Sequence, residues 1–163
     1  MEKLYSTFET CKILGIKRVT LKSWLTDGFI KPTLKTIEGR GPGERSLFNR
    51  NQLYLIRLFQ VMTANNISRN EAKSLIQKWN DVEPDPKNDE NWLTIFKTSK
   101  YLGKIEKGAA PIYAHTSTNP INLKDFRLIF KNFPVKYEIE DFDMINVFNL
   151  KKIRKSVDLD IGE

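Results

Sequence analysis

The sequence predicts an α+β protein, with four helices and a β-hairpin in the first half and a small mixed α/β module in the second. Three observations support this prediction. Apolar residues recur at helical spacing through the first half, a Gly/Pro-rich tip separates two short extended runs, and extended runs return after residue 91. The expected boundaries are 1–80 for the first domain, 81–91 for an acidic, Pro-containing linker and 92–163 for the C-terminal module.

Composition narrows the class of protein. The chain has 163 residues, 40% hydrophobic and 29% charged, which is typical of a globular protein. No apolar run approaches the roughly 20 residues of a membrane-spanning helix, and the N-terminus lacks the apolar core of a signal peptide. We therefore expect a cytoplasmic protein without a membrane partner. The single cysteine, Cys11, excludes an internal disulfide or a Cys-cluster metal site and is expected to pack as a small hydrophobe.

Charge is distributed unevenly between the two halves. Residues 1–80 hold 14 Lys/Arg and 6 Asp/Glu, a net charge of +8. Residues 81–163 hold 13 Lys/Arg and 14 Asp/Glu, a net charge of −1. This asymmetry favours a polyanionic partner for the first half, although a basic protein without such a partner would show the same charge.

A short first helix is expected over residues 5–14. Ser6 and Glu9 have the spacing of a capping box, in which each residue satisfies a backbone N–H group of the other. Gly15 supplies the turn that follows. The expected apolar face of this helix consists of Phe8, Cys11 and Leu14.

The second helix lies within the stretch KRVTLKSWLTDGFIKP, residues 17–32. It is expected to end at Asp27-Gly28, because glycine readily enters the left-handed conformation of a helix stop. Its apolar positions are Ile16, Leu21, Trp24 and Leu25. Its remaining surface is basic and hydroxyl-bearing, with Lys17, Arg18, Thr20, Lys22 and Ser23. A short basic helix of this kind suits the major groove of duplex DNA.

A β-hairpin is expected over residues 33–48, with its tip at residues 39–43. Lys35, Arg40 and Arg45 would allow this hairpin to contact phosphates beside the groove. The alternative is a surface hairpin with incidental charge.

Two more helices follow the hairpin. The first is expected from the N-cap Asn49 to about Ala64 and is apolar nearly all round, so it should be buried between the first domain and either the second half or another copy of the chain. The next helix starts with a second capping box, Ser68 and Glu71. Its apolar stripe is Ala72, Leu75, Ile76 and Trp79.

This order of features resembles the MerR family of bacterial regulators over about half of the chain. The residues that carry the resemblance are Tyr5, Glu9, Lys12, Gly15, Thr20, Leu21, Lys22, the aromatic Trp24, the exit Gly28-Phe29-Ile30-Lys31-Pro32, Phe48, Leu53 and Asn66-Ile67-Ser68. The resemblance implies a winged helix-turn-helix that binds duplex DNA, with the second helix in the major groove and the wing on the backbone. By position, Thr20 and Lys22 take DNA-contact roles.

The largest departure from this family is the stretch DVEPDPKNDE, residues 81–90, where the family continues into a coiled-coil helix. Its five acids and two prolines indicate a linker. A homodimer would therefore form through the third helix or the C-terminal module.

In the second half, strands are expected at residues 92–96, 112–115, 135–139 and 144–148, a helix at 122–133 and a final short helix, LKKIRKSV, after Asn149. His115 is the only histidine and has no nucleophile elbow beside it, so no catalytic residue, cofactor or metal ligand is expected. An acidic cluster could bind a cation and consists of Glu138, Glu140, Asp141 and Asp143. A basic cluster could bind nucleic acid and consists of Lys151, Lys152, Arg154 and Lys155. For each cluster, the alternative is a solvated surface without a ligand.

Together these patterns favour a sequence-specific, double-stranded DNA-binding transcriptional regulator and not an enzyme. The expected DNA contacts are Lys17, Arg18, Thr20, Lys22, Ser23, Lys35, Arg40 and Arg45. An architectural or recombination accessory protein would use the same elements with weak sequence preference. A protein-interaction adaptor would reuse the winged helix without binding DNA. The C-terminal module would serve oligomerisation or effector binding, and the sequence does not identify a small-molecule effector.

Overall fold

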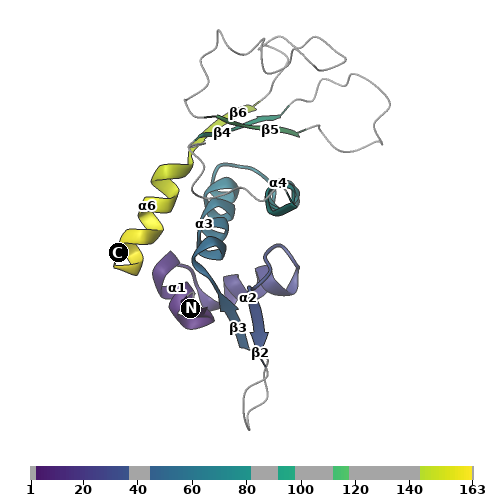
Figure 1. Cartoon of the computed structure of the whole chain (residues 1–163). Helices are drawn as coiled ribbons and strands as arrows, with labels where there is room; N and C mark the ends of the chain where they lie inside the picture. The colour runs from purple at the N-terminus through teal and green to yellow at the C-terminus, as the bar shows by residue number, and fades with distance from the viewer. Residues whose placement is uncertain (1–2, 37–44, 82–91, 98–111, 118–143, 163) are drawn as a thin grey trace. The chain divides into compact units, whose positions relative to one another are not determined.

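The computed structural model describes residues 3–36, 45–81, 92–97, 112–117 and 144–162. The chain forms two compact units: unit 1 comprises Met1–Pro86 with Lys152–Glu163, and unit 2 comprises Lys87–Lys151. The described residues contain five helices and two three-stranded sheets, so the predicted α+β class is confirmed (Figure 1). Residues 152–163, expected in the C-terminal module, belong to unit 1.

Unit 1 begins with a two-residue strand and a short helix. Strand β1 is Tyr5–Ser6 and helix α1 is Thr7–Leu14. The predicted capping box is present: the Glu9 backbone N–H donates to Ser6 Oγ at 3.3 Å, and the Ser6 N–H donates to the Glu9 carboxylate at 2.8 Å. The Ser6 hydroxyl also donates to this carboxylate, at 2.7 Å, and the two hydrogen bonds from the Ser6 N–H and hydroxyl lower the pKa of Glu9. Gly15 ends the helix with φ 61, as expected.

The apolar face predicted for α1 is wrong at one position. Phe8 is 75% exposed, whereas Leu14 and Thr10 are fully buried. Cys11, between them along the helix, is half-buried. The helix therefore turns a different set of residues toward the core than the spacing suggested.

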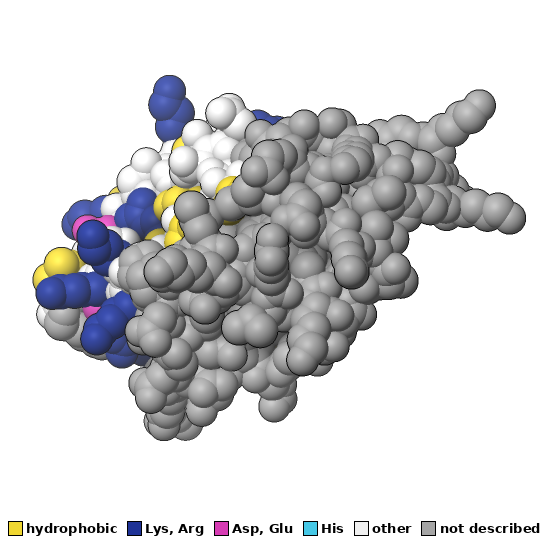
Figure 2. Space-filling view, turned by 90° about the horizontal axis from the view of Figure 1, so that it is seen from above, with side chains coloured by type: hydrophobic (Ala, Val, Ile, Leu, Met, Phe, Trp, Pro, Cys, Tyr) yellow, Lys and Arg dark blue, Asp and Glu magenta, His cyan; other side chains and the backbone are white. Residues whose placement is uncertain are grey.

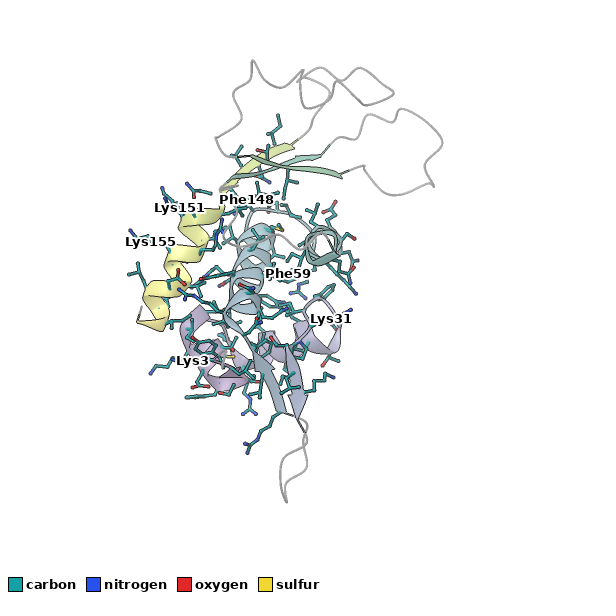
Figure 3. All side chains as sticks on the ribbon, in the orientation of Figure 1. Lys3, Lys31, Phe59, Phe148, Lys151 and Lys155 are labelled. Carbon is teal, nitrogen blue, oxygen red and sulfur yellow. The ribbon has the colours of Figure 1, made fainter. Side chains whose placement is uncertain are left out.

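Helix α2, Arg18–Thr26, packs its apolar side against helix α3. Leu21 and Trp24 are buried, and the Trp24 ring meets Phe59 of α3 edge-on with centroids 4.9 Å apart. Phe29, just beyond α2, stacks on the Phe59 ring with centroids 5.9 Å apart. Figure 3 shows Phe59 at this central position in unit 1. Gly28 has φ +67, so the predicted glycine stop is confirmed.

An antiparallel hairpin follows α2. Strands β2 (Leu34–Thr36) and β3 (Arg45–Phe48) pair with Leu34 opposite Leu47 and Thr36 opposite Arg45. Strand β1 joins the other edge of β3, with Tyr5 opposite Phe48. The predicted tip, residues 39–43 with Arg40, lies outside the described residues. In Figure 1 the hairpin extends from the same end of unit 1 at which α1 and α2 lie.

Helix α3, Arg50–Ala64, forms the centre of the core. The Asn49 side chain accepts a hydrogen bond from the Gln52 N–H at 2.9 Å and caps the helix as predicted. Its buried apolar side chains are Leu53, Ile56, Leu58, Phe59 and Met62. Helix α4, Arg69–Asp81, starts with the predicted box, in which the Ser68 N–H donates to Glu71 at 2.8 Å.

Unit 2 contains the second sheet. Its strands are β4 (Trp92–Lys97), β5 (Ile112–Ser117) and β6 (Met144–Asn149), in the order β5-β4-β6 and antiparallel throughout. Leu93, Ile95 and Phe148 are buried. These three strands were predicted; the expected helix 122–133, strand 135–139 and acidic cluster Glu138, Glu140, Asp141 and Asp143 lie outside the described residues.

Helix α6 spans Leu150–Ile161. It starts where the sequence predicted but continues past the expected end at Val157 to Ile161. Among the described helices, none has the length and apolar character needed to cross a membrane.

Candidate nucleic-acid interface

Helix α2 has two chemically different sides. Leu21 and Trp24 are buried on the inner side. The predicted contact residues lie on or beside the outer side: Lys17, Arg18 and Lys22 are exposed, and Thr20 and Ser23 are half-buried. The helix sequence RVTLKSWLT contains no carboxylate, and the acidic residue beside it is Asp27, at its C-terminal cap.

The N-terminus of α2 adds to this positive character. Lys17 occupies the N-cap position and makes no side-chain cap hydrogen bond, and the first turn contains no acidic residue. The first backbone N–H groups of a helix lack intrahelical acceptors and carry a partial positive charge. At α2 this charge adds to the side-chain charges of Lys17 and Arg18, and the end of the helix attracts anions.

Ser23 differs from the other predicted contacts. Its hydroxyl donates to the Asp27 carboxylate, with an Oγ–Oδ2 distance of 3.0 Å. The hydroxyl proton is thereby used within the C-terminal turn of α2. Ser23 retains acceptor capacity toward a base or a side chain, whereas a phosphate would require the donor that Asp27 now takes.

The two described basic residues of the hairpin do not share a face. Lys35 pairs with Ser46, and Thr36 pairs with Arg45. Because successive side chains of a strand point to opposite faces, Lys35 lies on the face of Ser46 and Phe48, and Arg45 lies on the other face. Both side chains are exposed. The hairpin thus carries positive charge on each of its faces instead of on one.

A second basic surface lies on α6. Lys151, Lys152 and Lys155 are exposed, and Arg154 is half-buried. Figure 3 shows Lys151 and Lys155 projecting outward from the helix. In the view from above, Lys and Arg side chains gather on the side at which Figure 1 places α6 (Figure 2). Positive charge on the described surface is therefore not confined to α2 and the hairpin.

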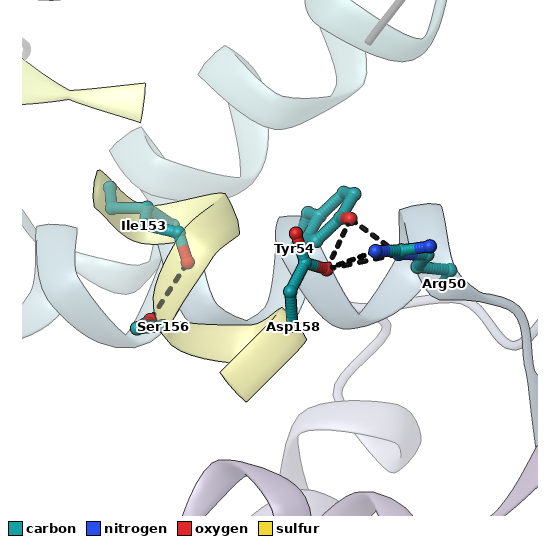
Figure 4. Close-up of polar contacts among 5 residues, drawn as sticks. All are labelled: Arg50, Tyr54, Ile153, Ser156 and Asp158. Carbon is teal, nitrogen blue, oxygen red and sulfur yellow. Dashed lines mark hydrogen bonds and ion pairs between the residues drawn. The ribbon is translucent and has the colours of Figure 1, made fainter. Parts of the chain in front are cut away.

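Helix α6 is tied to α3 by a compact polar cluster that the sequence did not predict (Figure 4). The Tyr54 hydroxyl donates to Asp158 Oδ1 at 2.6 Å and accepts from Arg50 Nε at 2.6 Å. Arg50 also pairs with Asp158 at 2.7 Å. The sequence feature that could have predicted this cluster is a polar stripe on an otherwise apolar helix, formed by Arg50, Tyr54 and Arg57 at i, i+4 and i+7.

Arg57 connects three helices of unit 1. One guanidinium nitrogen donates to the carbonyl of Leu14, at the end of α1, at 3.2 Å, and the other pairs with Asp160 of α6 at 2.9 Å. This side of α3 is therefore occupied by α1 and α6 of the same chain. The sequence left open whether the second half or another copy would cover α3.

The described residues offer little for catalysis or metal binding. In the ranges that the structure covers, no group of three or more His, Cys, Asp or Glu side chains lies close enough to hold a metal ion. Burial raises the pKa of the Cys11 thiol, so the nucleophilic thiolate is disfavoured. His115 lies on β5 opposite Thr94.

No protein-family model matches the chain, and no curated protein matches it. We therefore infer the function from the side chains of unit 1 and from the chemistry that they can carry out.

Proposed function

We propose that this protein is a sequence-specific, double-stranded DNA-binding transcriptional regulator in which α1, α2 and the β2–β3 hairpin act as a winged helix-turn-helix. One observation carries the proposal: α2 buries Leu21 and Trp24 while its opposite side presents Arg18 and Lys22, and none of its own residues Arg18–Thr26 is acidic. The packed inner side fixes the position of the helix, and its outer side is positively charged.

The dimensions of α2 suit a major groove. An α-helix with its side chains is about 10–12 Å across, and the major groove of B-form DNA is about 12 Å wide. With its N-terminus toward the DNA, α2 would place its uncapped first turn, Lys17 and Arg18 near a phosphate. Thr20 and Lys22 would then face base edges or the backbone, the roles that the resemblance to MerR regulators implies. Phosphate contacts would set affinity, and base contacts would set specificity.

The hairpin would contact the phosphate backbone beside the groove. Arg45 and Lys35 lie on opposite faces, so a hairpin lying flat on the DNA would use one of them, and a hairpin inserted edge-on would use both. Either arrangement adds positive charge next to α2.

We also propose that the protein acts as a homodimer on an inverted repeat. The chain lacks a heptad pattern after residue 80, so it would not dimerise through a coiled coil. One side of α3 is occupied by α6 of the same chain through Asp158 and Asp160. We therefore place the contact between copies in unit 2.

Selection from a randomised duplex library near physiological salt tests the proposal. The full chain should enrich an inverted repeat and bind it at least about 10³-fold more tightly than a scrambled duplex. Binding without an enriched motif would instead indicate an architectural protein that recognises DNA shape. Absence of DNA binding would contradict the proposal and leave α2 and the hairpin as a surface for a protein partner.

A further inference from the structure

An apolar side chain stands at the centre of the basic side of α2. Val19 is 79% exposed, although it lies in the first turn of a helix whose inner face is well packed. Helical periodicity places Lys22 and Ser23 one turn further along the same side, with Arg18 and Thr20 as chain neighbours. Four polar or charged side chains therefore surround an isopropyl group that takes no part in the core.

We propose that Val19 recognises the C5-methyl group of a thymine in the major groove, an inference that rests on the proposed DNA-binding function. Valine has no hydrogen-bond donor or acceptor, so it cannot read the polar pattern of a base edge. The apolar feature that base pairs expose in the major groove is the thymine methyl. Contact between the two would remove both apolar surfaces from water.

The position of Val19 also suits recognition by shape. A β-branched side chain in a helix has one strongly preferred χ1 rotamer, so the two methyl groups are already oriented before DNA binds. Arg18 and Lys22, on either side along the chain, would bind flanking phosphates and hold α2 at a fixed depth in the groove. The charged residues would position the helix, and Val19 would favour thymine over cytosine, which lacks the methyl group at the same ring position.

Deoxyuridine substitution tests this inference, because deoxyuridine pairs like thymidine but lacks the C5-methyl group. Each thymine in one half-site of the selected duplex is replaced singly, and affinities are measured for the full wild-type chain and for Val19→Ala. At one position, wild type should lose about fourfold in affinity, the equivalent of one buried methyl group. Val19→Ala should bind the thymine duplex with similarly reduced affinity and should not distinguish it from the deoxyuridine duplex at that position.

Leu159→Ala is the matched control. Leu159 is also an exposed aliphatic residue of unit 1, 64% accessible, but it lies on α6. This variant should retain the wild-type response to deoxyuridine. Both substitutions replace an exposed helical residue with alanine, which favours helix, so both variants should fold.

The outcomes separate the two proposals. If a specific site is selected but no deoxyuridine substitution changes the affinity of wild type, the role of Val19 is overturned and sequence-specific DNA binding remains. The same conclusion follows if the affinity of Val19→Ala changes with deoxyuridine as that of wild type does. Failure to select any specific site overturns both, and the exposed valine would then belong to a protein-docking surface.

Discussion

At the scale of single residues, the Tyr54 hydroxyl is the centre of the contact between α3 and α6. It donates to Asp158 and accepts from Arg50, both at 2.6 Å. Burial, together with the neighbouring Asp158 carboxylate, raises the pKa of Tyr54 from 10.0 to about 12. The hydrogen bond to Asp158 also raises the pKa of the Arg50 guanidinium, so Arg50 keeps its positive charge throughout the alkaline range in which Tyr54 titrates.

Replacing Tyr54 with phenylalanine should have an effect that depends on pH. Near neutral pH, Tyr54→Phe should lower the free energy of unfolding by about 1 kcal/mol, because it removes hydrogen bonds to partly buried charged partners. Between pH 10.0 and about 12, the unfolded chain releases the phenol proton while the folded chain retains it, so wild-type stability falls as pH rises. The phenylalanine variant has no such group.

The measurement is urea unfolding of wild type and Tyr54→Phe, first near neutral pH and then across that alkaline range. The difference in stability between the two proteins should shrink as pH rises, because the groups that titrate in both cancel. A constant difference at every pH would show that the Tyr54 phenol is not held in its neutral form by α6.

The Phe8 side chain shows why a face predicted from spacing can be wrong. Phe8, Cys11 and Leu14 follow one another at intervals of three residues, and each interval rotates the position by about 60° around the helix. Phe8 therefore lies about 120° from Leu14, whereas Thr10 lies about 40° from it. Packing around the fully buried Leu14 selects Thr10 and leaves Phe8 75% exposed.

At the scale of elements, α6 is part of the hydrophobic core of unit 1 as well as of its polar cluster. Val157 is fully buried, while Leu159, two residues later, is 64% exposed. The carboxylates of Asp158 and Asp160 reach Arg50 and Arg57 of α3. Because these ion pairs are partly exposed, we expect them to orient the helix more than to stabilise it.

Truncation of Val157 tests this arrangement of α6. Val157→Ala should lower the free energy of unfolding by about 2 kcal/mol, from lost apolar burial and the cavity that remains. Leu159→Ala removes a larger side chain but should change stability by less than about 0.5 kcal/mol, because surface substitutions have small effects. Chemical unfolding measures the loss of stability in each variant. An equal loss, or a larger loss in Leu159→Ala, would contradict the packing of α6 within unit 1.

Elements whose boundaries depend on near neighbours were predictable from the sequence. The boxes at Ser6 and Ser68 and the cap at Asn49 each use a partner three residues away, so the local pattern contains the whole interaction. The start of α1 was predicted two residues early. Tyr5–Ser6 instead pair with Leu47 and Phe48, more than 40 positions along the chain, and no local pattern reports that contact.

In the candidate interface, too, features that depend on near neighbours in the chain were predictable, and features that depend on strand pairing were not. Exposure of Lys17, Arg18 and Lys22 followed from helical periodicity, because the apolar residues of α2 define its inner side. The separation of Lys35 and Arg45 onto opposite faces depends on the pairing register of the hairpin, which charge alone does not specify. Arg40 lies outside the described residues.

At the scale of the whole molecule, positive charge lies on two surfaces, one formed by α2 with the hairpin and the other by α6, and either could attract DNA. Residues 1–80 carry a net charge of +8, but α6 adds exposed Lys151, Lys152 and Lys155. A diffuse positive field would attract DNA to either surface. Direct contact differs from such a field because each neutralised phosphate releases condensed counterions, and this release sets the slope of affinity against salt concentration.

Salt titration of three alanine variants therefore locates the contact with the selected duplex. Lys22→Ala and Arg45→Ala should each lower the magnitude of the log–log salt slope by about one unit, because each removes one phosphate contact. Lys155→Ala removes the same charge from α6 and should leave the slope unchanged. Unchanged slopes in both of the first two variants would exclude docking through α2 and the hairpin, whereas a reduced slope in Lys155→Ala would place a phosphate contact on α6.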